Sequence, residues 1–175
     1  MKSEQIVSII LAIACLITIV LVGVLSNLLK ETNEENARYS FSRFQLWIWS
    51  IVICPAFSLN WGFVNPTLPK INLTTLLLLS ISLSVSLTSA LVASMQKVGK
   101  FDLKKENFFK DILTDDTGQV SIGRLQQFIF TMIYLCVYLT YFFSHNMNYP
   151  DFDKTAFVLM GISTGSYVLA KSLNK

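Results

Sequence analysis

Charged residues are scarce in this chain of 175 residues. They make up 14% of the sequence, against roughly a quarter in soluble domains. Hydrophobic residues make up 53% and the mean hydropathy is +0.53. The net charge of +3 is too weak and too scattered to indicate binding to a nucleic-acid polymer. A chain this poor in charge is predicted to be a membrane protein.

Residues that carry chemistry are also few. The single histidine, His145, has no metal-binding partner nearby in the sequence, and the three cysteines lie in apolar runs. The chain contains no P-loop, dinucleotide-binding glycines, HExxH or nucleophile elbow. Its predicted spans hold no ionisable residue at mid-membrane depth, which disfavours a proton relay. We therefore predict no enzymatic activity, no metal and no cofactor.

Long runs without Lys, Arg, Asp or Glu are what the sequence has instead. Four such windows exceed the roughly 20 residues that a helix needs to cross the hydrocarbon core. The predicted spans within them are residues 6–28, 44–63, 73–94 and 125–143. A fifth window, 155–170, is long enough for only ~24 Å of helix, against a core of ~30 Å. We predict a short fifth span there, with a re-entrant segment as the alternative.

The distribution of positive charge predicts how these spans are oriented. Eleven of the fourteen Lys and Arg residues lie in the two long loops and at the C-terminus. The positive-inside rule then places the C-terminus in the cytoplasm and the N-terminus outside. The prediction is a multi-pass protein of a bacterial inner membrane, in contact with the lipid bilayer.

The sequence repeats itself with an offset of 81 residues. "SFSRFQLWIWS" at residues 40–50 is echoed by "SIGRLQQFIFT" at residues 121–131. Identical pairs at this offset include Ser40/Ser121, Arg43/Arg124, Gln45/Gln126, Asn65/Asn146 and Pro69/Pro150. Matches of this kind across two helices and a loop indicate an internal duplication. Each unit crosses the membrane twice, so the copies are parallel, unlike the inverted repeats common in secondary transporters.

The predicted fold is therefore an all-α membrane protein with one N-terminal helix and two tandem helical hairpins. Its predicted parts are an N-terminal transmembrane helix, a first hairpin, a cytoplasmic amphipathic linker and a second hairpin, at residues 1–30, 38–96, 97–120 and 121–175.

Four polar residues are predicted at the cytosolic mouth, where each hairpin begins. They are Arg43, Gln45, Arg124 and Gln126. Topology anchoring explains them, since an Arg belongs at the membrane interface. A second interpretation is a polar ring that receives lipid phosphate or an anionic ligand such as a nucleotide.

Small residues mark the two returning helices. Those predicted to pack against a neighbouring helix or to line a pore are Ser80, Ser84, Thr88, Gly161 and Gly165. The alternative is that the hydroxyls bond only to their own backbone.

The linker carries apolar residues at helical spacing. Phe101, Phe108, Phe109 and Ile112 are predicted to share one face, either lying on the cytosolic leaflet or docked under the bundle. The same face is the predicted docking surface for a cytosolic partner.

The repeated S-x-(S/G)-R-x-Q start, together with "LLSIS" and "LMGISTGSY" in the returning helices, resembles a group of uncharacterised bacterial inner-membrane proteins. The resemblance covers residues 38–173 and implies location and fold. Small multi-span proteins of this type also resemble membrane effectors of anti-phage defence operons.

These observations lead to three functional hypotheses. The first is a homo-oligomeric channel or pore-type effector, triggered by a cytosolic partner or a nucleotide signal, with a hydroxyl-lined or hydrophobic constriction. The second is a membrane anchor or scaffold for a cytosolic partner. The third is a small-solute carrier, which the parallel repeat disfavours.

Overall fold

The computed structural model of the chain describes residues 2–30, 38–67, 70–79, 107–114 and 119–160. These residues form helices and turns, without a strand among them. The three long helices are α1 (Ser3–Leu25), α2 (Phe41–Phe63) and α5 (Ile122–Ser144), each of 23 residues. The short ones are η1 (Asn27–Leu29), α4 (Phe108–Leu113), α6 (Lys154–Leu159) and the helical segment 73–79.

The three long helices are long and apolar enough to cross a membrane. At about 1.5 Å per residue each is roughly 35 Å long, which exceeds a hydrocarbon core of ~30 Å. Each helix starts three residues before the predicted span, because the helix includes the charged residue of its first turn. Those residues are Glu4, Arg43 and Arg124.

Two predicted spans are described only at their beginnings, as residues 73–79 and 154–160. The remainder of each lies outside the described residues, so a count of five spans stays a prediction. Six of the predicted site residues also lie outside the described residues, so their roles stay predictions: Ser80, Ser84, Thr88, Phe101, Gly161 and Gly165.

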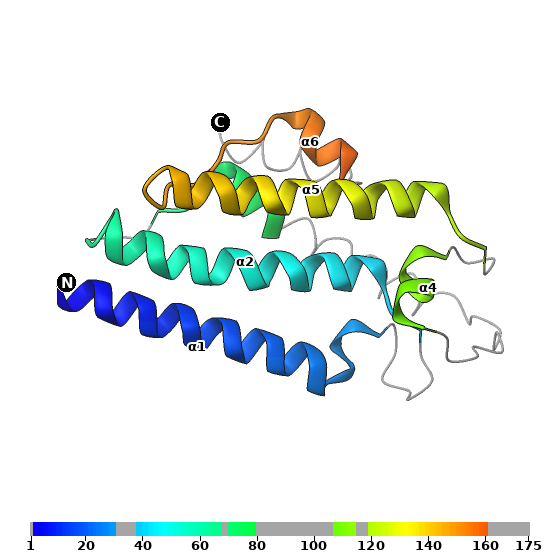
Figure 1. Cartoon of the computed structure of the whole chain (residues 1–175), viewed down its shortest axis with the longest axis horizontal. Helices are drawn as coiled ribbons and strands as arrows, with labels where there is room; N and C mark the ends of the chain where they lie inside the picture. The colour runs from blue at the N-terminus through cyan, green and yellow to red at the C-terminus, as the bar shows by residue number, and fades with distance from the viewer. Residues whose placement is uncertain (1, 31–37, 68–69, 80–106, 115–118, 161–175) are drawn as a thin grey trace, which may run out of the picture.

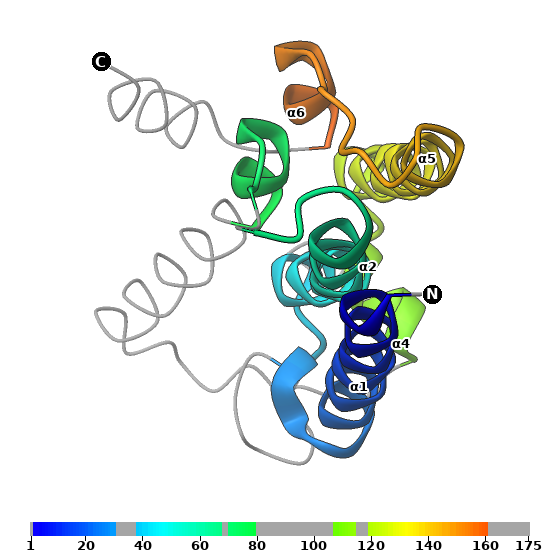
Figure 2. The ribbon, with the colours of Figure 1, turned by 90° about the vertical axis from the view of Figure 1, so that its left-hand side faces the viewer.

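Helices α1, α2 and α5 lie side by side in a row (Figures 1 and 2). Helix α2 runs antiparallel to α1 and parallel to α5, and α4 lies at the end where α2 and α5 begin (Figure 1). Helix α6 and the segment 73–79 lie on the side of the row away from α1 (Figure 2). Every described long helix therefore has at least one neighbour that covers part of its apolar surface.

Glycines allow α1 and α2 to approach closely near both ends. A Cβ atom at Gly62 would overlap the Ser8 hydroxyl, and one at Gly23 would overlap the Trp47 indole. The indole also donates from Nε1 to the carbonyl of Ile19 at 3.0 Å. Small residues at such contacts are how helices gain packing energy in lipid.

Large side chains fill the space between α2, α5, α6 and the segment 73–79. Trp49, Tyr138, Phe142, Leu78 and Met160 are each at most 1% exposed. The rings of Trp49 and Tyr138 meet edge to face with centroids 5.9 Å apart. The described part of the bundle is therefore a packed core, with aromatic rings where a single-chain pore would need an open path.

A buried amide holds the turn after α5. Asn60 of α2 is 2% exposed and donates to the carbonyl of Met147 at 2.8 Å. Asn146 and Met147 have positive φ values of 53° and 62°, a region that a residue such as Met rarely adopts. The bond from Asn60 helps to stabilise this turn.

Candidate functional site where α2 and α5 begin

The backbone just before α2 is held by a small group of hydrogen bonds, which we call a clamp. The N–H of Ser40 donates to the carbonyl of Leu29 at 2.8 Å, and Lys30 pairs with Tyr39 in an isolated β-bridge. Arg43, in the first turn of α2, donates from Nη1 to the carbonyl of Lys30 at 2.5 Å. The guanidinium thus ties the helix to the segment that precedes it.

The chain enters α5 in the same way. The N–H of Ser121 donates to the carbonyl of Leu113 at 2.9 Å, and Thr114 pairs with Val120 in a second isolated bridge. Arg124 donates from Nη1 to the carbonyl of Thr114. Eight residues separate the first bridged pair and five the second, so the loops differ in length while the clamps agree.

Helix α4 connects the two clamps. Arg38 donates from Nη2 to the Thr114 hydroxyl, and the N–H of Tyr39 donates to Oδ2 of Asp111 at 3.4 Å. The Phe108 ring lies 5.0 Å from the Tyr39 ring, measured between centroids. We call the five residues Arg38, Tyr39, Phe108, Asp111 and Thr114 the platform.

Aromatic rings extend from the platform into the bundle. The ring of Phe108 lies 5.5 Å from that of Phe44, and Phe44 stacks on Phe128 of α5 at 5.9 Å. Asp111 is 4% exposed and Thr114 is 2% exposed. A platform whose polar groups are this well buried and bonded forms a rigid base for the side chains it presents outward.

The structure does not gather the four predicted mouth residues into one ring. Arg43 and Arg124 bind backbone carbonyls, as described above. Gln45 lies among helices, where its Nε2 donates to the Thr131 hydroxyl and to the Met160 carbonyl, each at 3.0 Å. Gln126 is exposed on α5. The geometry of these residues is that of helix ties more than of a ligand ring.

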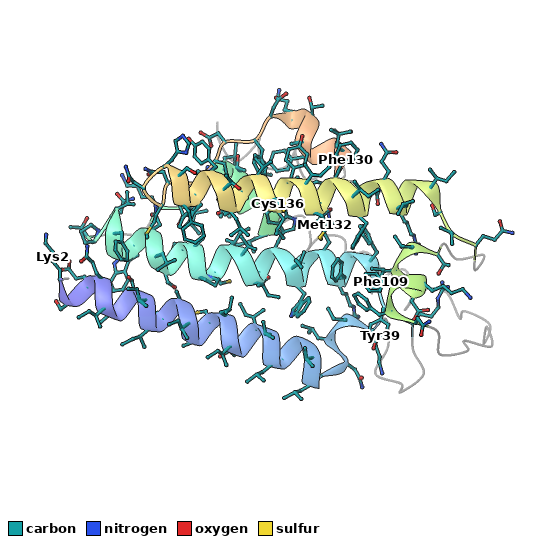
Figure 3. The ribbon with its side chains drawn as sticks, viewed as in Figure 1. Lys2, Tyr39, Phe109, Phe130, Met132 and Cys136 are labelled. Atoms are coloured by element: carbon teal, nitrogen blue, oxygen red, sulfur yellow. The ribbon has the colours of Figure 1, made fainter. Side chains whose placement is uncertain are left out.

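The predicted apolar face of the linker helix is divided in the structure, because its residues do not all point the same way. Ile112 is fully buried and Phe108 packs in the aromatic cluster, but Phe109 is 63% exposed. Figure 3 shows Phe109 and Tyr39 at this end of the molecule. Val120 and Ile122, which follow the second bridge, are 61% and 82% exposed. We call Phe109, Val120 and Ile122 the apolar rim.

The part of the chain that the structure describes contains no set of side chains suited to bind a metal ion. No group of three His, Cys, Asp or Glu side chains there is arranged to hold an ion.

Sequence reasoning missed most of the platform. The sequence predicts no contact for Arg38, and it places Asp111 and Thr114 only within the amphipathic linker of residues 97–120. A signal was present: "LLKE" at residues 28–31 resembles "ILTD" at residues 112–115. The offset there is 84 residues, so a comparison at 81 without gaps does not align the two segments.

The chain was compared with known proteins in three ways. No family model, no curated protein and no solved structure matches it. The resemblance drawn from the repeat therefore remains an expectation, and function has to be argued from the geometry of the chain itself.

Proposed function

We propose that this protein is a membrane-embedded anchor that docks a cytosolic protein partner on the apolar rim. The observation that carries the proposal is three exposed apolar side chains in the segments that the platform joins: Phe109 on α4, and Val120 and Ile122 where α5 begins. Exposed apolar side chains are typical of interaction sites when they form one patch. The positive-inside rule places this end in the cytoplasm.

The packed core supports an anchor over a channel formed by one chain. Water or ions moving between α2 and α5 would have to displace the fully buried rings of Tyr138 and Trp49. A close-packed core of this kind has no open path. The described helices of one chain therefore leave no path between α2 and α5.

The complete architecture belongs to the same proposal: five spans, with two tandem hairpins, in a bacterial inner membrane. Each bound of α5 lies 81 residues after the corresponding bound of α2. The next helical segments begin at residues 73 and 154, also 81 apart, after the capping residues Asn72 and Asp153. This agreement of helix ends supports the duplication.

A pair of phenylalanines provides the test. Phe109 on the rim and Phe143 at the far end of α5 are both 63% exposed. We expect Phe109→Ser to lower the recovery of a stoichiometric cytosolic partner from native membranes at least fivefold, measured by quantitative mass spectrometry, while Phe143→Ser leaves recovery unchanged. Equal recovery from both variants, or equal loss, would contradict the docking role.

A homo-oligomeric pore is the second candidate, and one observation favours it. Three buried apolar residues of α2 have exposed counterparts on α5. The buried residues are Phe44, Val52 and Ala56, and their counterparts at an offset of 81 are Leu125, Ile133 and Val137. The exposed face is thus available to a second copy.

The mass of the protein in nanodiscs tests the pore. A ring of four or more chains that is lost in Ile133→Ser, with depolarisation of the membrane on a partner or nucleotide signal, would support the pore-type defence effector. A monomer or simple dimer would leave too few helices to enclose a path, and the pore would be abandoned.

A further inference from the structure

A groove lies between α1 and α2, on the side of α2 away from the packed core. It encloses about 490 Å³ and is lined by Thr18 and Val22 of α1, Leu28 of η1, and Arg43, Trp47 and Ser50 of α2 among others. The lining spans the first turns of α2 and the last turns of α1, so the groove lies toward the platform end of these helices.

The polar side chains in the walls of this groove use their hydrogen-bond donors within the protein. The Thr18 hydroxyl donates to the carbonyl of Ala14 at 2.8 Å, and the Ser50 hydroxyl donates to that of Leu46 at 2.9 Å. The Trp47 N–H is likewise given to a backbone carbonyl, that of Ile19. These donors are satisfied by the helices themselves, so the walls suit a hydrocarbon chain.

Arg43 supplies positive charge at one end of the groove. Its Nη1 donates to the carbonyls of Lys30 and Leu28, at 2.5 and 3.4 Å, which fixes where the guanidinium lies. Ser50 is seven residues farther along α2, a distance of about 10 Å. A cation at the interface with ~10 Å of apolar groove leading into the membrane matches the phosphate and upper acyl chain of one phospholipid.

We infer that this groove binds an anionic glycerophospholipid, with its phosphate at Arg43 and an acyl chain against Trp47. The inference does not depend on the docking role of the apolar rim, because the two features involve different helices and different residues. According to this inference, α1 forms one wall of a lipid-binding site in addition to crossing the membrane.

Quenching of Trp47 fluorescence by brominated lipid tests the inference. The protein carries Trp49→Phe and Trp61→Phe, so that Trp47 is its only tryptophan, and is placed in mixed vesicles of phosphatidylglycerol and phosphatidylcholine in which one lipid or the other is dibrominated. We expect the anionic lipid to compete for the groove about fivefold better, the effect of one basic residue near the membrane surface. Arg43→Gln should abolish this preference while quenching itself persists.

Two further variants separate the groove from the surface. Arg124→Gln removes the matching clamp at α5, which does not line the groove, and should leave the preference unchanged. Thr18→Phe should fill the groove and reduce quenching by both lipids. Equal quenching by the two lipids, a preference that survives Arg43→Gln, or full quenching in Thr18→Phe would each overturn the inference.

Two additional measurements keep the test decisive. Inorganic phosphate at 10 mM should not displace the anionic lipid; displacement would show a site for the free ion and overturn the inference. Native mass spectrometry of the protein with all three tryptophans, mixed with the two lipids, should show the anionic lipid retained preferentially. Equal retention of both would overturn the inference without relying on the tryptophan substitutions.

Discussion

Helices α2 and α5 have the same length and the same clamp at their start, but their surroundings differ. A third of the most apolar window of α2 is buried, against 17% of that window in α5. Helix α2 has α1 on one side and α5 on the other, whereas the described residues cover less of α5. The repeated sequence therefore specifies how each helix begins. The greater burial of α2 comes from the additional neighbour α1.

One position explains why α1 packs on α2. Gly62 of α2 makes room for Ser8 of α1, and the residue 81 positions later on α5 is Phe143, which is 63% exposed. A phenylalanine at the contact would hold the two helices apart. The difference between Gly62 and Phe143 therefore favours packing of α1 on α2, as does the second close contact, between Gly23 and Trp47.

Placing the α5 residue at the α2 site should break this arrangement. We expect Gly62→Phe to lower the free energy of unfolding by about 3 kcal/mol, because the ring has to displace α1. Phe143→Ala, a change at the exposed counterpart, should alter it by less than about 0.5 kcal/mol. Unfolding by denaturant in detergent micelles, followed by circular dichroism, measures both. Equal stability of the two variants would mean that α1 does not pack at Gly62.

The paired glutamines give a smaller effect of the same kind. Gln45 bonds to the Thr131 hydroxyl and to the Met160 carbonyl, whereas its counterpart Gln126 is exposed. Gln45→Leu should cost about 1–2 kcal/mol, as expected for buried polar bonds between membrane helices. Gln126→Leu should be nearly neutral in the same unfolding assay. A loss of the same size in both would show that the two positions are equivalent.

Much of the helical framework could be predicted from the sequence, because charge-free windows are a direct consequence of the hydrocarbon core. Residues 44–63 and 125–143 fall within α2 and α5, and 6–25 of the predicted 6–28 within α1. The predicted starts lie three residues inside the helices because capping and clamping, not hydropathy, decide where these helices start, whereas the predicted end at residue 63 is the end of α2.

The platform could not be predicted in the same way. Its contacts join residues 69 to 76 positions apart, such as Tyr39 to Phe108 and Arg38 to Thr114. Local patterns give no information on which loop meets which helix. Helical spacing did predict that Phe108 and Ile112 lie together, but it could not show that they face inward and leave Phe109 outside.

The smallest predicted effect concerns two buried tyrosines. The Tyr138 hydroxyl lies 3.3 Å from that of Thr75, within hydrogen-bond distance, whereas the Tyr149 hydroxyl is buried without a hydrogen-bond partner among the described residues. Tyr149→Phe should therefore leave stability unchanged or raise it by up to about 1 kcal/mol, while Tyr138→Phe lowers it by about 1 kcal/mol. Destabilisation of both to the same extent would show that Tyr149 has a partner.

The stability of the protein at alkaline pH should also depend on the buried hydroxyl of Tyr149. Burial, and next the neighbouring Tyr138, raise the pKa of Tyr149 above its ordinary value of 10.0. A raised pKa means that the folded protein holds the proton more tightly, so this contribution is complete below pH 10 and is lost as the pH rises above it. Tyr149→Phe should lose less stability between pH 10 and 11 than the unchanged protein. Identical losses would contradict burial of this phenol.

The most direct test of the account is the sidedness of the two matching helices in a membrane. In a variant without the three native cysteines, single cysteines replace Ser42 and Gly123 at the starts of α2 and α5, and Thr67 and Asn148 beyond their ends. An impermeant thiol reagent should label the first pair only in inside-out vesicles and the second pair only in right-side-out vesicles. Labelling of Ser42→Cys and Gly123→Cys from opposite sides would contradict the parallel hairpins and, with them, a cytosolic platform.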